Sequence, residues 1–241
     1  MFSQEFEEIV QHRKSNRRYD PLIEVPDEVI QKSIKRAILS PNSSNMQLWE
    51  FYWIKSEESK KALVPLCLGQ SAAKTAKHMV VFVTRRDLWS LRAKWNLEKI
   101  KHKIGDQTPT KLQKRGLQYY GSIMPLAYRR DMLGITSLIR RCICFFMGLF
   151  KPFMRMGGNA DQRVVVHKSC ALAAQTFMLS ISAEGYDSCP MEGIDALRVK
   201  KLLNLPKGAE INMIISVGKG TEEGLYNERL RVPYEEVVFV K

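Results

Sequence analysis

Cysteine is scarce in this chain, and the few cysteines lack the pattern of a disulfide framework or a metal site. The 241 residues include five cysteines, an odd number without regular spacing, which argues against a secreted protein held together by disulfides. Only one residue separates Cys142 from Cys144, whereas common zinc motifs place at least two between paired ligands. The four histidines are scattered along the sequence. We therefore expect neither a structural nor a catalytic metal.

Acidic residues are few relative to basic ones. The chain has 25 Asp and Glu against 38 Lys and Arg, which gives a formal net charge of +13 at pH 7. Such a charge attracts nucleic acids, anionic lipids and phosphate-bearing small molecules alike. No motif resembles a helix-turn-helix, a zinc finger or an aromatic stacking sheet, so specific nucleic-acid recognition is not expected. Part of the basic excess falls in one acid-poor stretch, at Arg129, Arg130, Arg140, Arg141, Lys151, Arg155 and Arg163.

Long apolar runs are missing as well. The apolar run at residues 142–150 is far shorter than the roughly 20 residues that a membrane-spanning helix needs. Residues 1–10 read as a polar amphipathic helix rather than as a secretory leader. We therefore expect a cytoplasmic protein.

The hydrophobic pattern predicts many helices around a few strands. The run at residues 79–84 is continuous and rich in β-branched side chains, which is typical of a strand buried on both faces. Pro41 ends the helix that opens at Pro26, because proline cannot continue the helical hydrogen bonding. This pattern indicates a mixed α/β or α+β fold. Further strands are expected at 49–54 and 211–217 and an extended end at 235–240, with helices at 5–13, 56–66, 161–185 and 194–203.

Residues 86–160 form the least regular part of the sequence. We interpret them as a helical insertion that caps a pocket or extends a subunit interface. An alternative is an amphipathic helix that lies on an anionic membrane surface, because Phe145, Phe146, Leu149 and Phe150 stand beside basic residues. We favour the cap, since short apolar runs usually belong to a core.

Four separated segments carry side chains suited to a polar, phosphate-bearing ligand, although each has a plainer interpretation. The first segment, Arg13 to Tyr19, offers forked arginine donors and a short hydroxyl. Its plainer interpretation is a solvated end of a helix. Ser40 to Trp49 gathers short polar side chains before a strand, or is only a turn. The third, Ser188 to Asp195, is expected to be a loop in which Gly193 lets the backbone approach a ligand closely, or is only the entry to a helix. In the fourth, Arg229 and Arg231 point to one side of an extended segment, or form a charged strand edge.

Together, and in this order, the four segments resemble the pattern of nitroreductase-like flavoproteins. The family pattern is an Arg-Arg-Ser-x-Arg-x-Phe/Tyr start, a Pro-Ser-x-x-Asn-x-Gln-Pro-Trp turn, a Pro-x-Gly-Phe-Asp type of loop and a late Arg-x-Pro. The resemblance covers about the first 85 and the last 80 residues. This chain departs from it at Asn42, where serine is usual, and at Leu48, where proline is usual. Neither departure removes a charged contact.

The resemblance implies a nitroreductase-like domain across residues 1–241, with a central, mostly antiparallel sheet flanked by helices. It also implies an interlocked homodimer with FMN in the subunit interface and a variable insertion at 86–160. The residues it places at FMN fall into three groups: Arg13, Lys14, Ser15, Arg17, Arg229 and Arg231 for the phosphate, ribityl chain and flavin edge; Pro41, Asn42, Ser43 and Asn45 for the partner subunit's flavin; and Gln70, Pro190, Met191, Glu192 and Gly193 for the ring.

The chemistry implied by the resemblance is hydride transfer through flavin N5. NADH or NADPH would reduce FMN, and a nitroaromatic, quinone or similar electron-poor acceptor would reoxidise it with ping-pong kinetics. No side chain is expected to act as catalytic acid, base or nucleophile, because the cofactor carries the reaction. The alternatives are a flavoprotein of the same fold that performs reductive dehalogenation or flavin destruction, and a basic protein that binds a membrane surface or nucleic acid.

Overall fold

A four-stranded antiparallel sheet forms the centre of the molecule. A computed structural model describes residues 2–129 and 133–241, so Arg130 of the acid-poor stretch lies outside the described residues. The strands β1 (Trp49–Ile54), β2 (His78–Thr84), β3 (Asp187–Met191) and β4 (Glu210–Gly218) are arranged in the order β1-β2-β4-β3. All three pairings are antiparallel. The expected α+β class with an antiparallel sheet is therefore confirmed.

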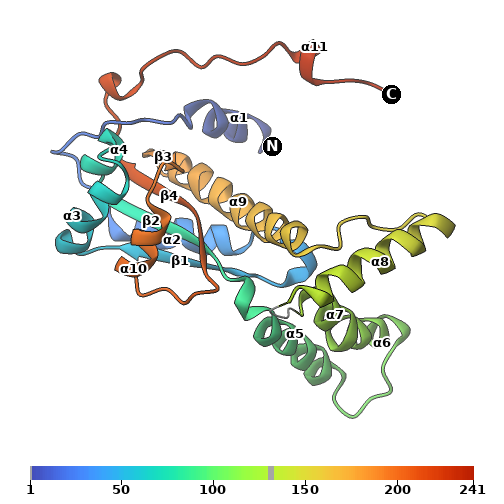
Figure 1. Ribbon diagram of the computed structural model, residues 1–241. Helices are drawn as coiled ribbons and strands as arrows, with labels where there is room; N and C mark the ends of the chain where they lie inside the picture. Colours follow the sequence, from blue (N-terminus) through green and yellow to red (C-terminus); the bar gives the residue numbers. More distant parts are fainter. Residues whose placement is uncertain (1, 130–132) are drawn as a thin grey trace.

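Two helices cover one face of this sheet. The long helix α9 (Asn159–Ala183) runs across it, and α2 (Asp27–Ile38) packs against α9 (Figure 1). Because side chains alternate along a strand, Val80 and Phe82 of β2 point to this face. Phe82 meets Phe177 of α9 edge to face, with 5.5 Å between the ring centroids. This layer is the larger part of the core.

The other face is covered by shorter helices. These are α3 (Glu57–Leu66), α4 (Ser71–Lys74) and α10 (Ala196–Leu202), which pack over Met79 and Val81 of β2. Helix α3 begins as the sequence predicts, because the hydroxyl of Ser56 accepts a hydrogen bond from the backbone N–H of Ser59 at 3.2 Å. Strand β2 is thus buried on both faces, as its apolar run predicts.

Helix α9 is long and apolar enough to cross a membrane if only length and composition are considered. Its packing gives a simpler reason for that composition. Cys170, Ala173, Phe177 and Ile181 are fully buried against α2 and the sheet. We therefore assign α9 to the core.

The middle of the chain is helical where it is described. It comprises η2 (Arg86–Leu88), α5 (Trp89–Ile104), α6 (Lys111–Gln118), η3 (Tyr119–Ile123), α7 (Met124–Tyr128) and α8 (Ile135–Phe150). A small core of its own, which includes Ala93, Met124 and Tyr128, joins α5 and α7 to Met46 and Leu48 beside the sheet. Figure 1 shows this group at one end of the sheet, with α8 extending away from it.

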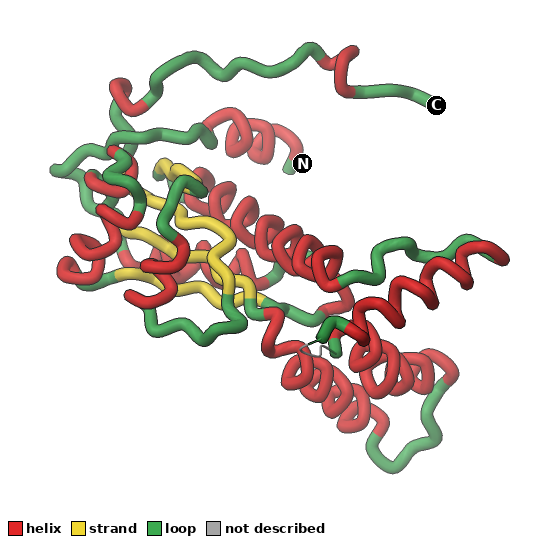
Figure 2. Tube along the Cα trace, in the orientation of Figure 1, coloured by secondary structure: helices red, strands yellow, loops and turns green. Residues whose placement is uncertain are grey.

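Two expectations about strands were wrong. Residues 187–191 form the edge strand β3 rather than part of a loop, and proline is tolerated there because an edge strand leaves some backbone N–H groups unpaired. Residues 235–240 do not form an extended strand. After Pro233 the chain makes one helical turn, α11 (Tyr234–Val237), and Val238 to Val240 pair with no strand among the described residues. Figure 2 shows the tail as a loop that runs away from the sheet beside α1 (Ser3–His12).

Candidate cofactor site

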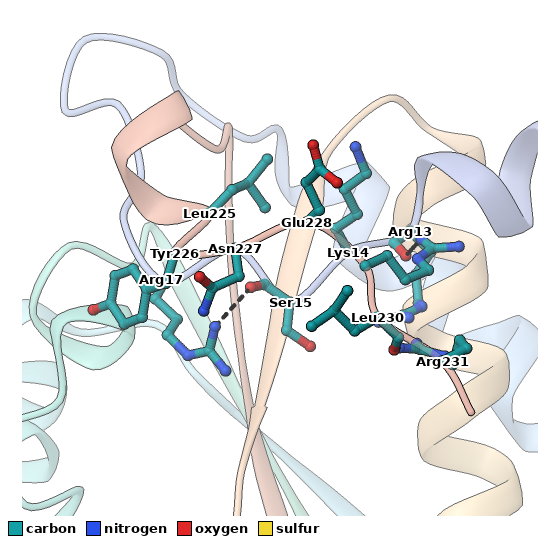
Figure 3. Close-up of a pocket in the computed structure, with 11 residues that line it drawn as sticks. Arg13, Lys14, Ser15, Arg17, Leu225, Tyr226, Asn227, Glu228, Leu230 and Arg231 are labelled. Carbon is teal, nitrogen blue, oxygen red and sulfur yellow. Dashed lines mark hydrogen bonds between the residues drawn. The ribbon is translucent and has the colours of Figure 1, made fainter. Parts of the chain in front are cut away.

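A cavity of about 460 Å³ lies between two segments that are far apart in sequence. One segment follows α1 and the other follows η4 (Glu222–Gly224). Figure 3 shows Arg17 and Tyr226 at one end of the cavity, Arg13 and Arg231 at the other, and Ser15 between them. The lining residues are Arg13, Lys14, Ser15, Arg17, Leu225, Tyr226, Asn227, Glu228, Arg229, Leu230 and Arg231. The cavity therefore brings together all six residues expected in the first group of FMN ligands.

The first segment is fixed to the sheet edge by backbone contacts. Ser15 forms an isolated parallel bridge with Ser188 of β3. The side chain of Asn16 is buried, and its Nδ2 donates to the carbonyl of Thr221 at 2.9 Å. Its Oδ1 accepts from the N–H of Arg18 at 3.0 Å. Asn16 thus holds the two segments together, a role that its place in a polar sequence does not reveal.

Gly224 allows the second segment to lie close against the first. Its carbonyl accepts a hydrogen bond from the N–H of Arg17 at 2.9 Å. A Cβ added at Gly224 would meet Oδ1 of Asn16 at 1.8 Å and the backbone nitrogen of Arg18 at 2.7 Å. Since one of these atoms is backbone, a side chain at position 224 must push the segments apart.

We predict that Gly224→Ala destabilises the protein by about 1–3 kcal/mol, as overpacking usually does, and also weakens cofactor retention. Urea unfolding and titration with FMN measure the two effects. Gly121→Ala is the matched control, because a Cβ there would make only one ordinary contact, at 3.9 Å. Equal flavin affinity in both variants would mean that the spacing of the two segments does not shape the cavity.

Arg229 has a structural task in addition to lining the cavity. Its Nη2 donates to the carbonyl of Gln11 at 3.0 Å and to that of Arg13 at 2.5 Å, and its Nη1 donates to the carbonyl of Val10 at 3.2 Å. These carbonyls lie at the end of α1, where backbone acceptors lack helical partners and a cation is favourable. Arg229 therefore ties the tail to α1. By contrast, within the described residues the side chain of Arg231 donates a hydrogen bond only to the carbonyl of its neighbour Leu230.

The cavity concentrates positive charge. Burial lowers the pKa of Arg13, and the nearby guanidinium groups of Arg229 and Arg231 lower it further. Glu228 is the one acidic residue in the lining. At the other end, the guanidinium of Arg17 lies 5.0 Å from the ring centroid of Tyr226, a cation–π contact. Cations that repel one another across a cavity favour an anionic ligand between them.

The third expected group lies in and near β3, the strand whose Ser188 pairs with Ser15 of the cavity lining. Pro190 and Met191 belong to β3, and Met191 is buried. The Nε2 of Gln70 donates to the carbonyl of Gly193 at 2.8 Å. Gln70 and Gly193 are thus brought together, whereas neither these residues nor Glu192 line the cavity itself. Sequence reasoning missed Tyr226 and Asn227, which do line it and carry no motif of their own.

The expected turn residues lie elsewhere in the chain. The Oδ1 of Asn42 accepts from the N–H of Gln47 at 2.8 Å, and the N–H of Ser43 donates to the hydroxyl of Ser169 at 3.1 Å. The turn is strained, because Ser44 and Gln47 have φ angles of 56° and 48°, in a left-handed region that serine and glutamine rarely adopt. Within one chain, Pro41, Asn42, Ser43 and Asn45 therefore do not join the cationic cavity.

This chain is similar in sequence and in fold to known proteins of one family. The model of the "Nitroreductase family" matches residues 10–219. A "NADH dehydrogenase" of Thermus thermophilus is 27% identical over 94% of this chain and 91% of its own length. A "Nitroreductase Family Protein" of Streptococcus pneumoniae has a TM-score of 0.71 and 20% identity, over 98% of this chain and 100% of its own. A protein of Exiguobacterium sibiricum solved in complex with FMN has a TM-score of 0.69 and 23% identity, over 98% of this chain and 97% of its own.

Proposed function

Because this chain belongs to the nitroreductase family, we propose that it is an FMN-dependent oxidoreductase that uses NADH or NADPH to reduce electron-poor acceptors. Nitroaromatics and quinones are the acceptor classes we propose. The observation that carries this proposal is the cationic cavity between residues 13–17 and 225–231. The FMN-bound protein of the same fold supports the choice of cofactor.

The cavity suits FMN in charge, in volume and in having arginines at both ends. Arg13 and Arg231 at one end match a phosphate, which arginine binds through paired donors. Arg17 at the other end matches the electron-rich edge of a flavin ring. The volume of about 460 Å³ lies within the range of roughly 300–1,000 Å³ that is usual for ligand sites.

We assign the individual roles as follows. Arg13, Ser15 and Arg231 hold the phosphate and the ribityl chain, while Arg229 mainly fixes the tail that carries Arg231. Arg17 supplies a fixed cation beside the N1 and C2-carbonyl edge, where it stabilises negative charge without reorganising. The remaining expected contacts are Lys14 with the flavin, and Gln70, Pro190, Met191, Glu192 and Gly193 along the ring.

When bound, FMN supplies two-electron chemistry, accepting a hydride from the nicotinamide and delivering it to the acceptor. The chain contributes binding, orientation and electrostatics around that cofactor. We propose that donor and acceptor occupy the same open face in turn, which predicts ping-pong kinetics.

A homodimer completes this proposal. The turn of Pro41, Asn42, Ser43 and Asn45 does not line the cavity of its own chain and is partly exposed, and we propose that it approaches the flavin of a partner subunit. The helices of residues 86–160 then serve as a variable insertion within one domain, near the substrate entrance. Sedimentation equilibrium tests the dimer directly.

We predict that the purified protein is yellow, carries FMN and oxidises NADH or NADPH when a nitroaromatic or quinone is present. Parallel lines in double-reciprocal plots would support the ping-pong scheme. A colourless preparation that cannot be reconstituted with FMN would contradict the proposal. Constant FMN content through many turnovers excludes flavin destruction, and release of halide from a halogenated acceptor would point instead to reductive dehalogenation.

A further inference from the structure

Helix α8 carries apolar side chains on a face that points away from the rest of the protein. Leu138, Phe146 and Phe150 are 62%, 59% and 87% exposed, and they recur at helical spacing. Together with their neighbours they border an open groove of about 450 Å³, lined by Leu138, Ile139, Cys142, Ile143, Phe146 and Met147. Among the described residues, nothing covers this face.

The opposite face of α8 is polar and is used inside the protein. Arg140 is buried, and its guanidinium donates to the carbonyl of Gly157 at 3.0 Å and to Oδ1 of Asn159 at 2.8 Å. The hydroxyl of Ser137 accepts from the N–H of Asn159 at 3.1 Å. A helix of a globular protein normally turns its apolar stripe to the core. In α8 a buried arginine faces the protein and large apolar side chains face outward. This arrangement favours a contact between the apolar face and something outside the chain.

Basic residues flank the apolar face along the chain and at the end of α8. Arg129, Arg141, Lys151 and Arg155 are exposed, and the sequence has no acidic residue from 132 to 160. Arg155 also donates to the carbonyl of Gly148 at 2.6 Å, which fixes its guanidinium beside the helix. Exposed Phe153 and Met154 extend the apolar surface past the end of α8.

We propose that α8 and residues 151–156 dock this protein onto an anionic membrane surface. At a rise of about 1.5 Å per residue, a helix of 16 residues is about 24 Å long, too short to cross a hydrocarbon core of about 30 Å. It lies in the plane of the interface with Phe146, Leu149 and Phe150 among the acyl chains. Lys151 and Arg155 contact anionic headgroups. This inference stands on α8 alone and is independent of the proposed redox chemistry.

Charge favours a membrane over a second copy of the chain on this face. A second copy docked symmetrically on this face would bring its own Arg129, Arg141, Lys151 and Arg155 close to the same basic residues, so self-association through this face is opposed. Anionic lipid is attracted by the same charge, by about fivefold in affinity for each Lys or Arg near the surface, which corresponds to about 1 kcal/mol.

The chain offers a natural probe position for this contact. Cys142 lies on the apolar face and is exposed, whereas Cys67, Cys144, Cys170 and Cys189 are buried. Burial raises the pKa of Cys67 to about 11 and that of Cys170 to about 12, which keeps these thiols protonated and unreactive at neutral pH. An environment-sensitive fluorophore can therefore be attached at Cys142 in the native protein.

The experiment adds vesicles to the labelled, FMN-loaded protein and also follows flotation of the unlabelled protein. Phosphatidylcholine vesicles are compared with vesicles that contain 30% phosphatidylglycerol. The test variant is Leu149→Glu combined with Phe150→Glu. Its control is Leu22→Glu combined with Leu39→Glu, which makes the same change at two residues that are 88% and 82% exposed outside α8. Lys151→Gln removes one charge.

We expect the fluorophore emission to shift to the blue, and the protein to float, with the anionic vesicles only. The α8 double variant should bind these vesicles at least tenfold more weakly, whereas its control should bind them as the unaltered protein does. Lys151→Gln should bind about fivefold more weakly. Binding that survives the double variant and vanishes in high salt would overturn the proposal, because the net charge alone would then suffice. Absence of vesicle binding would overturn it too, as would a blue shift that depends on protein concentration without vesicles, which would identify a second copy.

Discussion

Arg231→Ala should reduce the affinity for FMN by roughly ten- to a hundredfold. A hydrogen bond to a charged group contributes about 1.5–3 kcal/mol, and each 1.4 kcal/mol corresponds to about tenfold in affinity. In the part of the chain that the structure describes, the side chain of Arg231 donates one hydrogen bond, to the carbonyl of its neighbour Leu230. Its removal therefore leaves the tail in place and takes away the proposed phosphate ligand. Quenching of FMN fluorescence on binding gives the dissociation constant.

Arg115→Ala is the matched control for this variant. Arg115 is exposed on α6 and does not line the cavity, and its loss changes the net charge by the same amount. If both variants bound FMN as tightly as the unaltered protein, Arg231 would not be a phosphate ligand. A loss of equal size in both would attribute the effect to net charge alone.

Phe177→Ala should cost about 3–5 kcal/mol of stability, the usual range for deleting a buried aromatic ring. Phe177 is fully buried and meets Phe82 of β2. Its loss leaves a cavity between α9 and the centre of the sheet, where neighbouring strands limit relaxation. Urea unfolding at fixed protein and FMN concentrations measures the change.

Leu112→Ala tests whether any large apolar residue would have the same effect. Leu112 is 79% exposed on α6, and a surface substitution usually changes stability by no more than about 0.5 kcal/mol. A loss below about 1 kcal/mol for Phe177→Ala would contradict the assignment of α9 to the core.

The elements predicted best from the sequence are those with a strong local pattern. Residues 79–84 and 211–217 are strands because apolar, β-branched side chains occupy both faces, and this pattern leaves few alternatives. Strand β3 was missed because Pro190 and the polar residues at its start resemble a loop. It forms because β4 offers an edge for pairing, which is a tertiary contact.

In the candidate site, too, local chemistry could be predicted from the sequence and tertiary contacts could not. Arginines at 13, 229 and 231 could be predicted because their side-chain chemistry fits a phosphate and their order resembles a family. The roles of Asn16 and Gly224 could not, since they depend on contacts between residues about 200 positions apart. The double task of Arg229 was hidden for the same reason. Whether the turn of residues 41–45 serves a partner subunit stays a prediction.

The tie between Arg229 and the end of α1 also bears on when the protein can acquire its cofactor during synthesis. The arginines that we assign to the phosphate stand at positions 13 and 231, and the cavity closes only when residues 225–231 lie against residues 13–17. A chain still emerging from the ribosome exposes Arg13, whereas Arg231 is still inside the exit tunnel. Such a chain therefore has only one of the two proposed phosphate ligands. If Arg13 and Arg231 bind the phosphate as proposed, tight binding of FMN follows completion of the chain.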